Sequence, residues 1–287
     1  MPSILRNLLR GCARIFPDCV TLGQAIAFNM FLAFFPMLLF AVGLLSGTSF
    51  FQDALREIPA HLNVILPPSS TEVVAEYFLR RGLHPERWVY LGLIGTLLAG
   101  SQVMMGFIEC FRIIEGDPIP LGYWRRQVRA LVMLCLTIVP VLAVVGLTVF
   151  GKAFRAWLVH FTGAPHQVVH QATFVLYSFL VFVLAMTVLV TLYRLGRPGH
   201  PGILQLFPGA VVATGLWWAA DVLFGYYVRR VPYNLVYGGL AAAIGLLLWM
   251  YLTAMIVLLG AAYNAEAFEA RHEEKSILAH QLIARGR

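Results

Sequence analysis

Six long runs without a single Asp, Glu, Lys or Arg divide this chain and limit what it can fold into. The runs cover residues 19–52, 88–108, 130–151, 156–193, 198–220 and 231–265. A helix needs about 20 consecutive apolar residues to cross the hydrocarbon core of a bilayer. Strands are disfavoured, because the open edge of a sheet cannot face lipid. We therefore predict an all-α integral membrane protein with six transmembrane helices at 24–47, 89–112, 130–151, 170–193, 206–228 and 238–264.

The composition supports a membrane protein. Hydrophobic residues make up 60% of the 287 residues and charged residues 12%, whereas soluble domains are about 45–50% apolar and about 25% charged. These values exclude a soluble globular enzyme and a disordered chain. The formal net charge of +7 is interpreted as a topological signal and not as a nucleic-acid surface, because basic loops stay in the cytoplasm.

The distribution of basic residues predicts the topology. An even number of helices places both ends of the chain on one side. With both ends inside, 13 Lys and Arg residues lie on the inner face and 8 on the outer face. This bias favours an N-in, C-in arrangement. The predicted organisation is a cytoplasmic segment 1–23, a membrane domain 24–265 with an external cap at 48–88, and a cytoplasmic tail 266–287.

Two segments outside the predicted spans are amphipathic. Residues 3–16 carry Arg6, Arg10 and Arg14 at four-residue spacing opposite an apolar face, a pattern typical of a helix that lies on an anionic leaflet. The external cap 48–88 is expected to be a helical hairpin. Within it, Ser69-x-x-Glu72 resembles a capping box. Thr21-x-x-Gln24 has the same pattern and predicts the start of the first transmembrane helix.

Polar residues near the predicted spans provide the candidate binding site. Arg125, Arg126 and Arg129 precede the third helix and are interpreted either as ligands for lipid headgroups or as ordinary positive-inside anchors. Glu109 and Arg112 are expected to form an intrahelical ion pair. Asp221 lies inside the fifth helix. It is either a proton or cation site or an acid near the outer interface, paired with Arg229 or Arg230.

Other motifs indicate packing or nothing specific. Small residues four apart predict close helix contacts, and the pairs are Gly209 with Ala213, Gly215 with Ala219, and Gly238 with Ala242. His166 and His170 have the spacing of a metal pair, but no Cys or carboxylate joins them locally. No Walker A loop, G-x-S-x-G or G-x-G-x-x-G is present, so no enzyme activity, cofactor or metal is expected.

The last third of the chain resembles a known family. The stretches that carry the resemblance are Pro208-Gly209-Ala210, Leu216-Trp217, Phe224-Gly225-Tyr226-Tyr227-Val228, Tyr233 to Leu240 with its Tyr-x-x-x-Tyr-Gly pattern, Leu248-Trp249-Met250-Tyr251-Leu252, and Leu258-Leu259-Gly260-Ala261. Ala27-Phe28, Phe34-Phe35-Pro36 and Tyr193-Arg194 agree with it. This order resembles the YihY/virulence factor BrkB family of bacterial inner-membrane proteins. In this chain Tyr263 stands where the family has an acid, and Arg112 stands where Asn is common.

The resemblance implies an envelope role, and lipid or lipid A movement has been suggested for relatives. The family was long labelled ribonuclease BN. A metal-dependent nuclease needs clustered His and acidic ligands, and none of the 14 acids sits beside a cytoplasmic histidine cluster. We therefore expect a transporter or flippase-like protein for an amphipathic anionic lipid or envelope precursor. A membrane scaffold for envelope partners is the alternative, and a ribonuclease is the least favoured function.

The leading hypothesis assigns roles to six residues. Arg125, Arg126 and Arg129 would capture the headgroup, and Asp221, Tyr227 and Tyr237 would line the path. The expected location is the bacterial cytoplasmic (inner) membrane, in a multi-pass arrangement. The expected partners are anionic membrane lipids, with a second copy of the chain or an envelope protein as further candidates and no nucleic acid.

Overall fold

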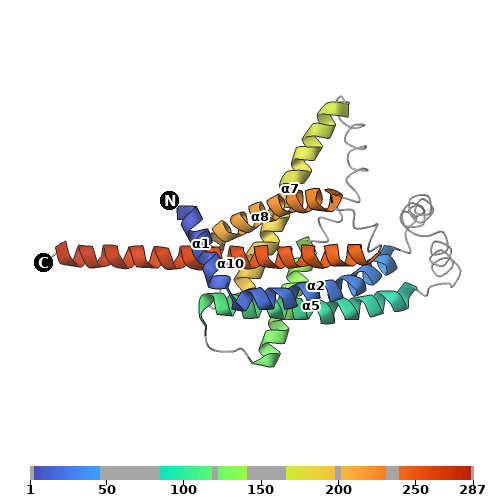
Figure 1. Ribbon diagram of the computed structural model, residues 1–287, viewed down its shortest axis with the longest axis horizontal. Coiled ribbons are helices and arrows are strands. Elements are labelled where there is room, and N and C mark those ends of the chain that lie inside the picture. Colours follow the sequence, from blue (N-terminus) through green and yellow to red (C-terminus); the bar gives the residue numbers. More distant parts are fainter. Residues whose placement is uncertain are drawn as a thin grey trace. The chain divides into compact units, whose positions relative to one another are not determined.

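A computed structural model describes residues 3–45, 85–117, 122–140, 166–197, 202–230 and 239–285. Helices account for nearly all of them (Figure 1), and these described ranges contain no strand. The helices are α1 Ser3–Ile15, α2 Asp18–Leu45, α5 Pro85–Glu115, α7 His166–Gly196, α8 Ile203–Arg230 and α10 Gly239–Arg285. Residues 123–140 are also helical.

Five of these helices are long and apolar enough to cross a membrane. The spans are Asp18–Phe40, Val89–Glu115, Val175–Gly196, Ile203–Tyr227 and Ala243–Ala270. They confirm an all-α, multi-pass membrane protein. The predicted span 130–151 is helical up to residue 140, and its remainder lies outside the described residues. Most of the predicted cap 48–88 also lies outside them, so the sixth span, the cap and the N-in, C-in topology stay predictions.

Five of the helices begin earlier than the predicted spans, and in α2 and α8 the earlier start changes the role of a motif. Helix α2 starts at Asp18, so Thr21 and Gln24 do not cap it; Asp18 places a negative charge at the positive end of the helix dipole. Helix α8 starts at Ile203, three residues before the predicted span at 206–228, and Pro208 lies inside it. At the other end of the chain, α10 continues through the predicted boundary at residue 265 to Arg285.

The chain divides into two compact units, Asn29–Gly100 and the combination of Met1–Phe28 with Ser101–Arg287. In the first unit, α2 and α5 approach closely at small residues. A Cβ on Gly92 would lie 2.7 Å from the Cα of Phe40, and one on Gly95 would lie 2.8 Å from the Cβ of Pro36. Small residues that let two backbones approach are a common basis of helix association in lipid.

In the second unit, α7, α8 and α10 meet at a junction built around two glycines. A Cβ on Gly260 of α10 would lie 2.7 Å from the Cβ of Ala213 and would collide with the hydroxyl of Tyr193. A Cβ on Gly209 of α8 would collide with the carbonyl of Gly260 and the amide of Asn264. The buried Tyr193 of α7 donates its hydroxyl to the carbonyl of Val257 at 2.9 Å. Helices α8 and α10 therefore touch backbone to backbone, and α7 joins them through the hydroxyl of Tyr193.

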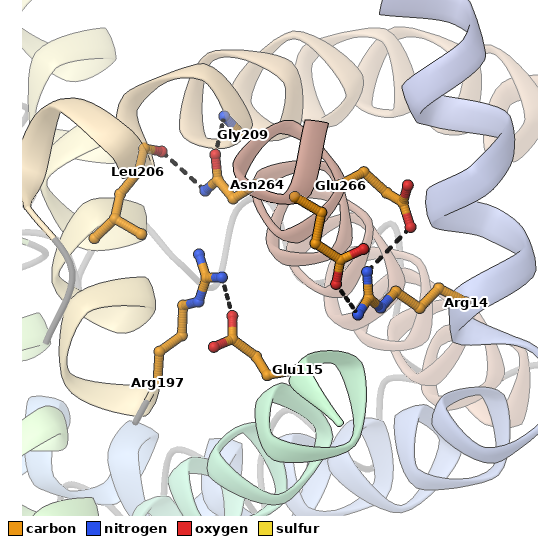
Figure 2. Close-up of polar contacts among 8 residues, drawn as sticks. Arg14, Glu115, Arg197, Leu206, Gly209, Asn264 and Glu266 are labelled. Carbon is orange, nitrogen blue, oxygen red and sulfur yellow. Dashed lines mark hydrogen bonds and ion pairs between the residues drawn. The ribbon is translucent and has the colours of Figure 1, made fainter. Parts of the chain in front are cut away.

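The same junction compensates for the proline in α8. Pro208 has no N–H group and disturbs the hydrogen-bond ladder of a helix. The side chain of Asn264, which is 1% exposed, bonds the backbone on both sides of it. The N–H of Gly209 donates to Asn264 Oδ1 at 2.7 Å, and Asn264 Nδ2 donates to the carbonyl of Leu206 at 3.0 Å (Figure 2).

Beyond the junction, α8 and α10 pack through apolar side chains. Ala213, Ala220 and Ile256 form a buried cluster. The ring of Trp249 lies 5.0 Å from that of Phe224 and 6.1 Å from that of Trp217. Three of these positions belong to the stretches that carry the family resemblance.

The predicted small-residue contacts are only partly correct. Gly209 and Ala213 are buried against α10, as predicted. Gly215 and Ala219 are exposed, and no described residue lies within 4 Å of a Cβ placed on Gly215, so the described helices do not make the predicted contact. The spacing was right in both pairs, but only one pair lies on the face of α8 that meets α10. Gly238 lies outside the described residues.

We expect Gly209→Ala and Gly260→Ala to lower the free energy of unfolding by about 1–3 kcal/mol, because each added methyl group overlaps backbone or a buried side chain. Gly215→Ala on α8 is the matched control. It should be neutral or stabilising by up to about 1 kcal/mol, since alanine favours the helix and the site is open. Thermal unfolding in detergent, followed by tryptophan fluorescence, measures all three. Equal midpoints for the three variants would contradict the junction.

A second experiment tests the role of Asn264. Asn264→Leu should destabilise the protein by about 1–3 kcal/mol, since it leaves backbone groups around Pro208 unpaired in a buried site. Pro208→Ala restores a donor to α8 and reduces the need for the amide. The double variant should therefore lose less stability than the sum of the two single variants. Strictly additive losses would show that Asn264 acts independently of Pro208.

Candidate functional site

Charged side chains from α5 and from residues 123–140 meet at Glu109. Its Oε2 accepts hydrogen bonds from Arg112 Nη1 at 2.9 Å and from Arg126 Nη1 at 3.3 Å. The first contact joins residues three apart on α5 and confirms the predicted intrahelical pair. The second links two helices and was not predicted. Arg112 Nη2 also donates to the backbone carbonyl of Asp117 at 3.3 Å.

Arg197, directly after α7, brings a charge from a third part of the chain to this group. Its side chain is 7% exposed and forms an ion pair with Glu115 at the end of α5 (Figure 2). Arg129 Nη2 donates to the backbone carbonyl of Arg197 at 3.4 Å. Burial, together with the nearby charge of Arg14, lowers the pKa of Arg197 to about 10. Burial also lowers the pKa of Arg129. Both guanidinium groups remain charged at neutral pH.

We call these residues the arginine cluster: Arg112, Arg126, Arg129 and Arg197 with Glu109 and Glu115. Four cations face two carboxylates, and the cluster remains positive even when Asp117 is counted with it. The Nε atoms of Arg112, Arg126 and Arg197 are buried, and the described residues supply them with no acceptor. Buried donors of this kind cost free energy. Charged groups with unpaired buried donors are a costly way to stabilise a fold. We therefore take the arginine cluster as a candidate binding site.

The N-terminal helix is attached to α10 beside this cluster. Arg14 Nη2 binds Glu269 Oε1 at 2.6 Å, and Arg14 Nη1 binds Glu266 Oε1 at 3.1 Å (Figure 2). The hydrogen bond to Glu269, followed by that to Glu266, raises the pKa of Arg14. Ile15 is buried, whereas Phe16 is exposed. Helix α1 confirms the predicted helix at 3–16, but Arg14 contacts protein, and the location of α1 at a leaflet stays a prediction.

The structure describes five of the six residues predicted to form the site, and they fall in two groups. Arg126 and Arg129 belong to the arginine cluster, and Arg125 is exposed beside them. Asp221 and Tyr227 are exposed on α8, and Tyr227 packs its ring 6.3 Å from that of Phe224. Helix α8 begins at Ile203. Asp221 lies 18 residues beyond this first residue, which is roughly 27 Å along the helix at about 1.5 Å per residue.

The remaining predicted contacts cannot be placed. Tyr237 lies outside the described residues, and so do the side chains of Arg229 and Arg230 that were alternative partners for Asp221. The side chains of His166 and His170 lie outside them as well. Within the described part of the chain, no three His, Cys, Asp or Glu side chains gather in a group that could hold a metal.

Sequence reasoning missed three residues that organise the site. They are Arg197, Glu115 and Asn264, to which the sequence patterns assigned no role in the site. One signal was available: Glu109, Arg112 and Glu115 follow one another at three-residue spacing along one side of α5. No sequence pattern indicated that Arg197 pairs with this row.

An apolar groove of about 830 Å³ lies between residues 123–140, α7 and α8. Its lining is mostly aliphatic and aromatic, with Arg194 as its charged residue. The lining residues are Leu136, Phe179, Phe182, Val183, Met186, Thr187, Val190, Thr191, Arg194, Leu195, Ile203 and Phe207. Arg194 and Arg197 are three residues apart, so the groove ends beside the arginine cluster.

The pair of Arg197 and Glu115 provides a test of the cluster. Arg197→Leu should destabilise the protein by about 3–5 kcal/mol, because it leaves the carboxylate of Glu115 without its cation. The double variant Arg197→Leu with Glu115→Leu should recover most of that loss, since an apolar pair can replace a buried ion pair. Thermal unfolding in detergent measures the cycle. A double variant less stable than either single variant would contradict the assigned pair.

Comparisons with known proteins agree with the membrane architecture. The family model described as virulence factor BrkB matches residues 16–282. A UPF0761 membrane protein of Aromatoleum aromaticum is 27% identical over 86% of this chain and 60% of its own length. A second, from Legionella pneumophila, is 24% identical over 90% of this chain and 60% of its own length. A ribonuclease-like protein of Bacillus subtilis, YfkH, is 23% identical over 84% of this chain and 86% of its own length.

The chain thus spans 60% of the length of the first two relatives. No solved structure matches it. The family model covers most of the chain and confirms the resemblance carried by the residues around Pro208, Tyr237 and Gly260. The chain therefore belongs to the virulence factor BrkB family of membrane proteins.

Proposed function

We propose that this protein moves an amphipathic anionic lipid, or a lipid-linked envelope precursor, as a transporter or flippase-like protein of the bacterial inner membrane. The observation that carries the proposal is the arginine cluster. It gathers positive charge at one end of an apolar helix bundle, beside an apolar groove. A site that is cationic at one end and apolar along its length matches a molecule with an anionic head and a hydrocarbon tail.

The chemistry of arginine supports an anionic ligand. A guanidinium group is always charged, and its fork of N–H donors fits the oxygens of a phosphate. Basic side chains near the cytoplasmic surface also attract anionic lipids. The positive-inside bias would place the arginine cluster at that surface. Arg125 is exposed next to Arg126 and Arg129 and is the residue of that group best placed to meet a headgroup.

The rest of the path remains part of the proposal. Asp221 and Tyr227 would line it toward the other end of α8, with Tyr237 beyond them. No catalytic step is proposed, so the ribonuclease-like name of one relative is not extended to this chain. A membrane scaffold that binds envelope partners without moving lipid is the alternative that the following experiment tests.

Lipid movement in liposomes is the direct test. The purified protein would be reconstituted with a fluorescent phosphatidylglycerol, and an impermeant reductant would quench the outer leaflet. We expect quenching beyond that leaflet for the wild type. Arg125→Ala should slow it about fivefold, because one basic residue at the membrane surface contributes about 1 kcal/mol. Asp221→Asn should slow it as well, since it removes a charge from the proposed path.

The variants are chosen to leave the fold intact. Arg125 and Asp221 are exposed, whereas Arg126 is bound to Glu109 and a triple alanine variant would also break that pair. Gly215→Ala is the control, since Gly215 is exposed and no described residue lies within 4 Å of a Cβ placed there. Quenching by the wild type that equals that of protein-free liposomes would contradict unassisted lipid movement and favour the scaffold.

A further inference from the structure

We propose that the groove between residues 123–140, α7 and α8 is a specific lipid site, which holds one acyl chain of an anionic phospholipid with its phosphate at Arg194. The proposal deepens the proposed function and rests on it for the class of ligand. It names the place at which the lipid binds and the cation that selects it. Neither Arg194 nor the groove was among the residues that the sequence patterns singled out for binding.

The size of the groove fits an acyl chain. Its volume of about 830 Å³ falls within the range of roughly 300–1,000 Å³ that is usual for small-molecule sites. Its lining extends along α7 from Phe179 to Arg194. This distance is roughly 22 Å at about 1.5 Å per residue. One leaflet of a bilayer has a hydrocarbon depth of roughly 15 Å, so a chain that starts at Arg194 can lie along the groove.

The wall and floor of the groove suit hydrocarbon. Phe182 and Val183 are exposed apolar side chains on its wall. Thr187 adds no free donor, because its hydroxyl donates to the carbonyl of Val183 at 2.9 Å. At the floor, the sulfur of the buried Met186 lies 3.2 Å from the hydroxyl oxygen of Thr214, whose proton is donated to the carbonyl of Ala210 at 2.8 Å. This contact joins α7 to α8. An unbranched thioether adapts easily to an irregular apolar ligand.

The charge at the end of the groove is available to a ligand. Arg194 is exposed, and the described residues offer it no ion pair or hydrogen bond. Arg197, three residues later, is buried and paired with Glu115. The two arginines at the end of α7 therefore have different roles: Arg197 holds helices together, and Arg194 faces outward at the mouth of an apolar groove. A phosphate oxygen is the complementary group for such a guanidinium.

Native mass spectrometry of the purified full chain would test the site with two probes, phosphatidylglycerol and phosphatidylcholine. The wild type should retain one phosphatidylglycerol at least fivefold more strongly than phosphatidylcholine. Arg194→Ala should abolish this preference, and Arg194→Lys should keep most of it, because the charge remains. Val183→Trp should fill the groove and remove the bound lipid. Val175→Trp, on an exposed position of α7 outside the lining, is the matched control and should retain it.

A photo-crosslinking amino acid at position 182 identifies the occupant directly. Crosslinks to lipid support the site. Crosslinks to a second copy of the chain, or to another segment of the same chain, would overturn it, and so would equal retention of the two lipids by the wild type.

The liposome assay separates the two proposals. Selective lipid binding without movement would uphold the groove and contradict transport. Movement of lipid by the wild type that Val183→Trp and Arg194→Ala leave unchanged would overturn the groove and leave transport standing.

Discussion

In the apolar interior, the side-chain amide of Asn264 supplies hydrogen bonds to the backbone of α8 on both sides of Pro208. Unpaired backbone groups are costly in hydrocarbon because no water can replace the missing partner. Asn264 accepts from Gly209 and donates to Leu206, so α10 has to lie at one position along α8. That register brings Gly260 against Gly209 and leaves the carbonyl of Val257 opposite the hydroxyl of Tyr193. One amide thereby sets the mutual position of three helices.

The arginine cluster depends on the same junction. Tyr193 is anchored to α10, and Arg197 follows it by four residues, about one helical turn. The end of α7 is therefore fixed where Arg197 can reach Glu115 and where its carbonyl can accept from Arg129. The groove shares this geometry, since its floor is the contact of Met186 with Thr214 between α7 and α8. A change at residue 264 should for this reason alter the site as well as the stability of the protein.

The sequence was sufficient for five of the six predicted spans and insufficient for the site. Charge-free runs identify spans because the bilayer excludes charge, a local property of each segment. Helix starts were less predictable, since Pro208 lies inside α8, where Asn264, more than 50 residues away, bonds the backbone on both sides of it. The pairing of Gly209 with Gly260 and the exposure of Gly215 depend on which face of α8 meets α10, and spacing alone cannot decide that. Arg112, Arg126 and Arg197 come together only after α5, residues 123–140 and α7 have packed.

The burial of the arginines divides them by role. A bundle of this kind could hold its helices with apolar side chains, because a buried ion pair seldom stabilises a protein more than a well-packed apolar pair. Arg112 and Arg197 are nevertheless buried and bound to glutamates, whereas Arg125 and Arg194 are exposed nearby. The inner arginines fix the ends of the helices, and the outer arginines form no ion pair with any described residue. This division agrees with the anionic ligand that we propose, because a charge that only held helices together would not need to be exposed.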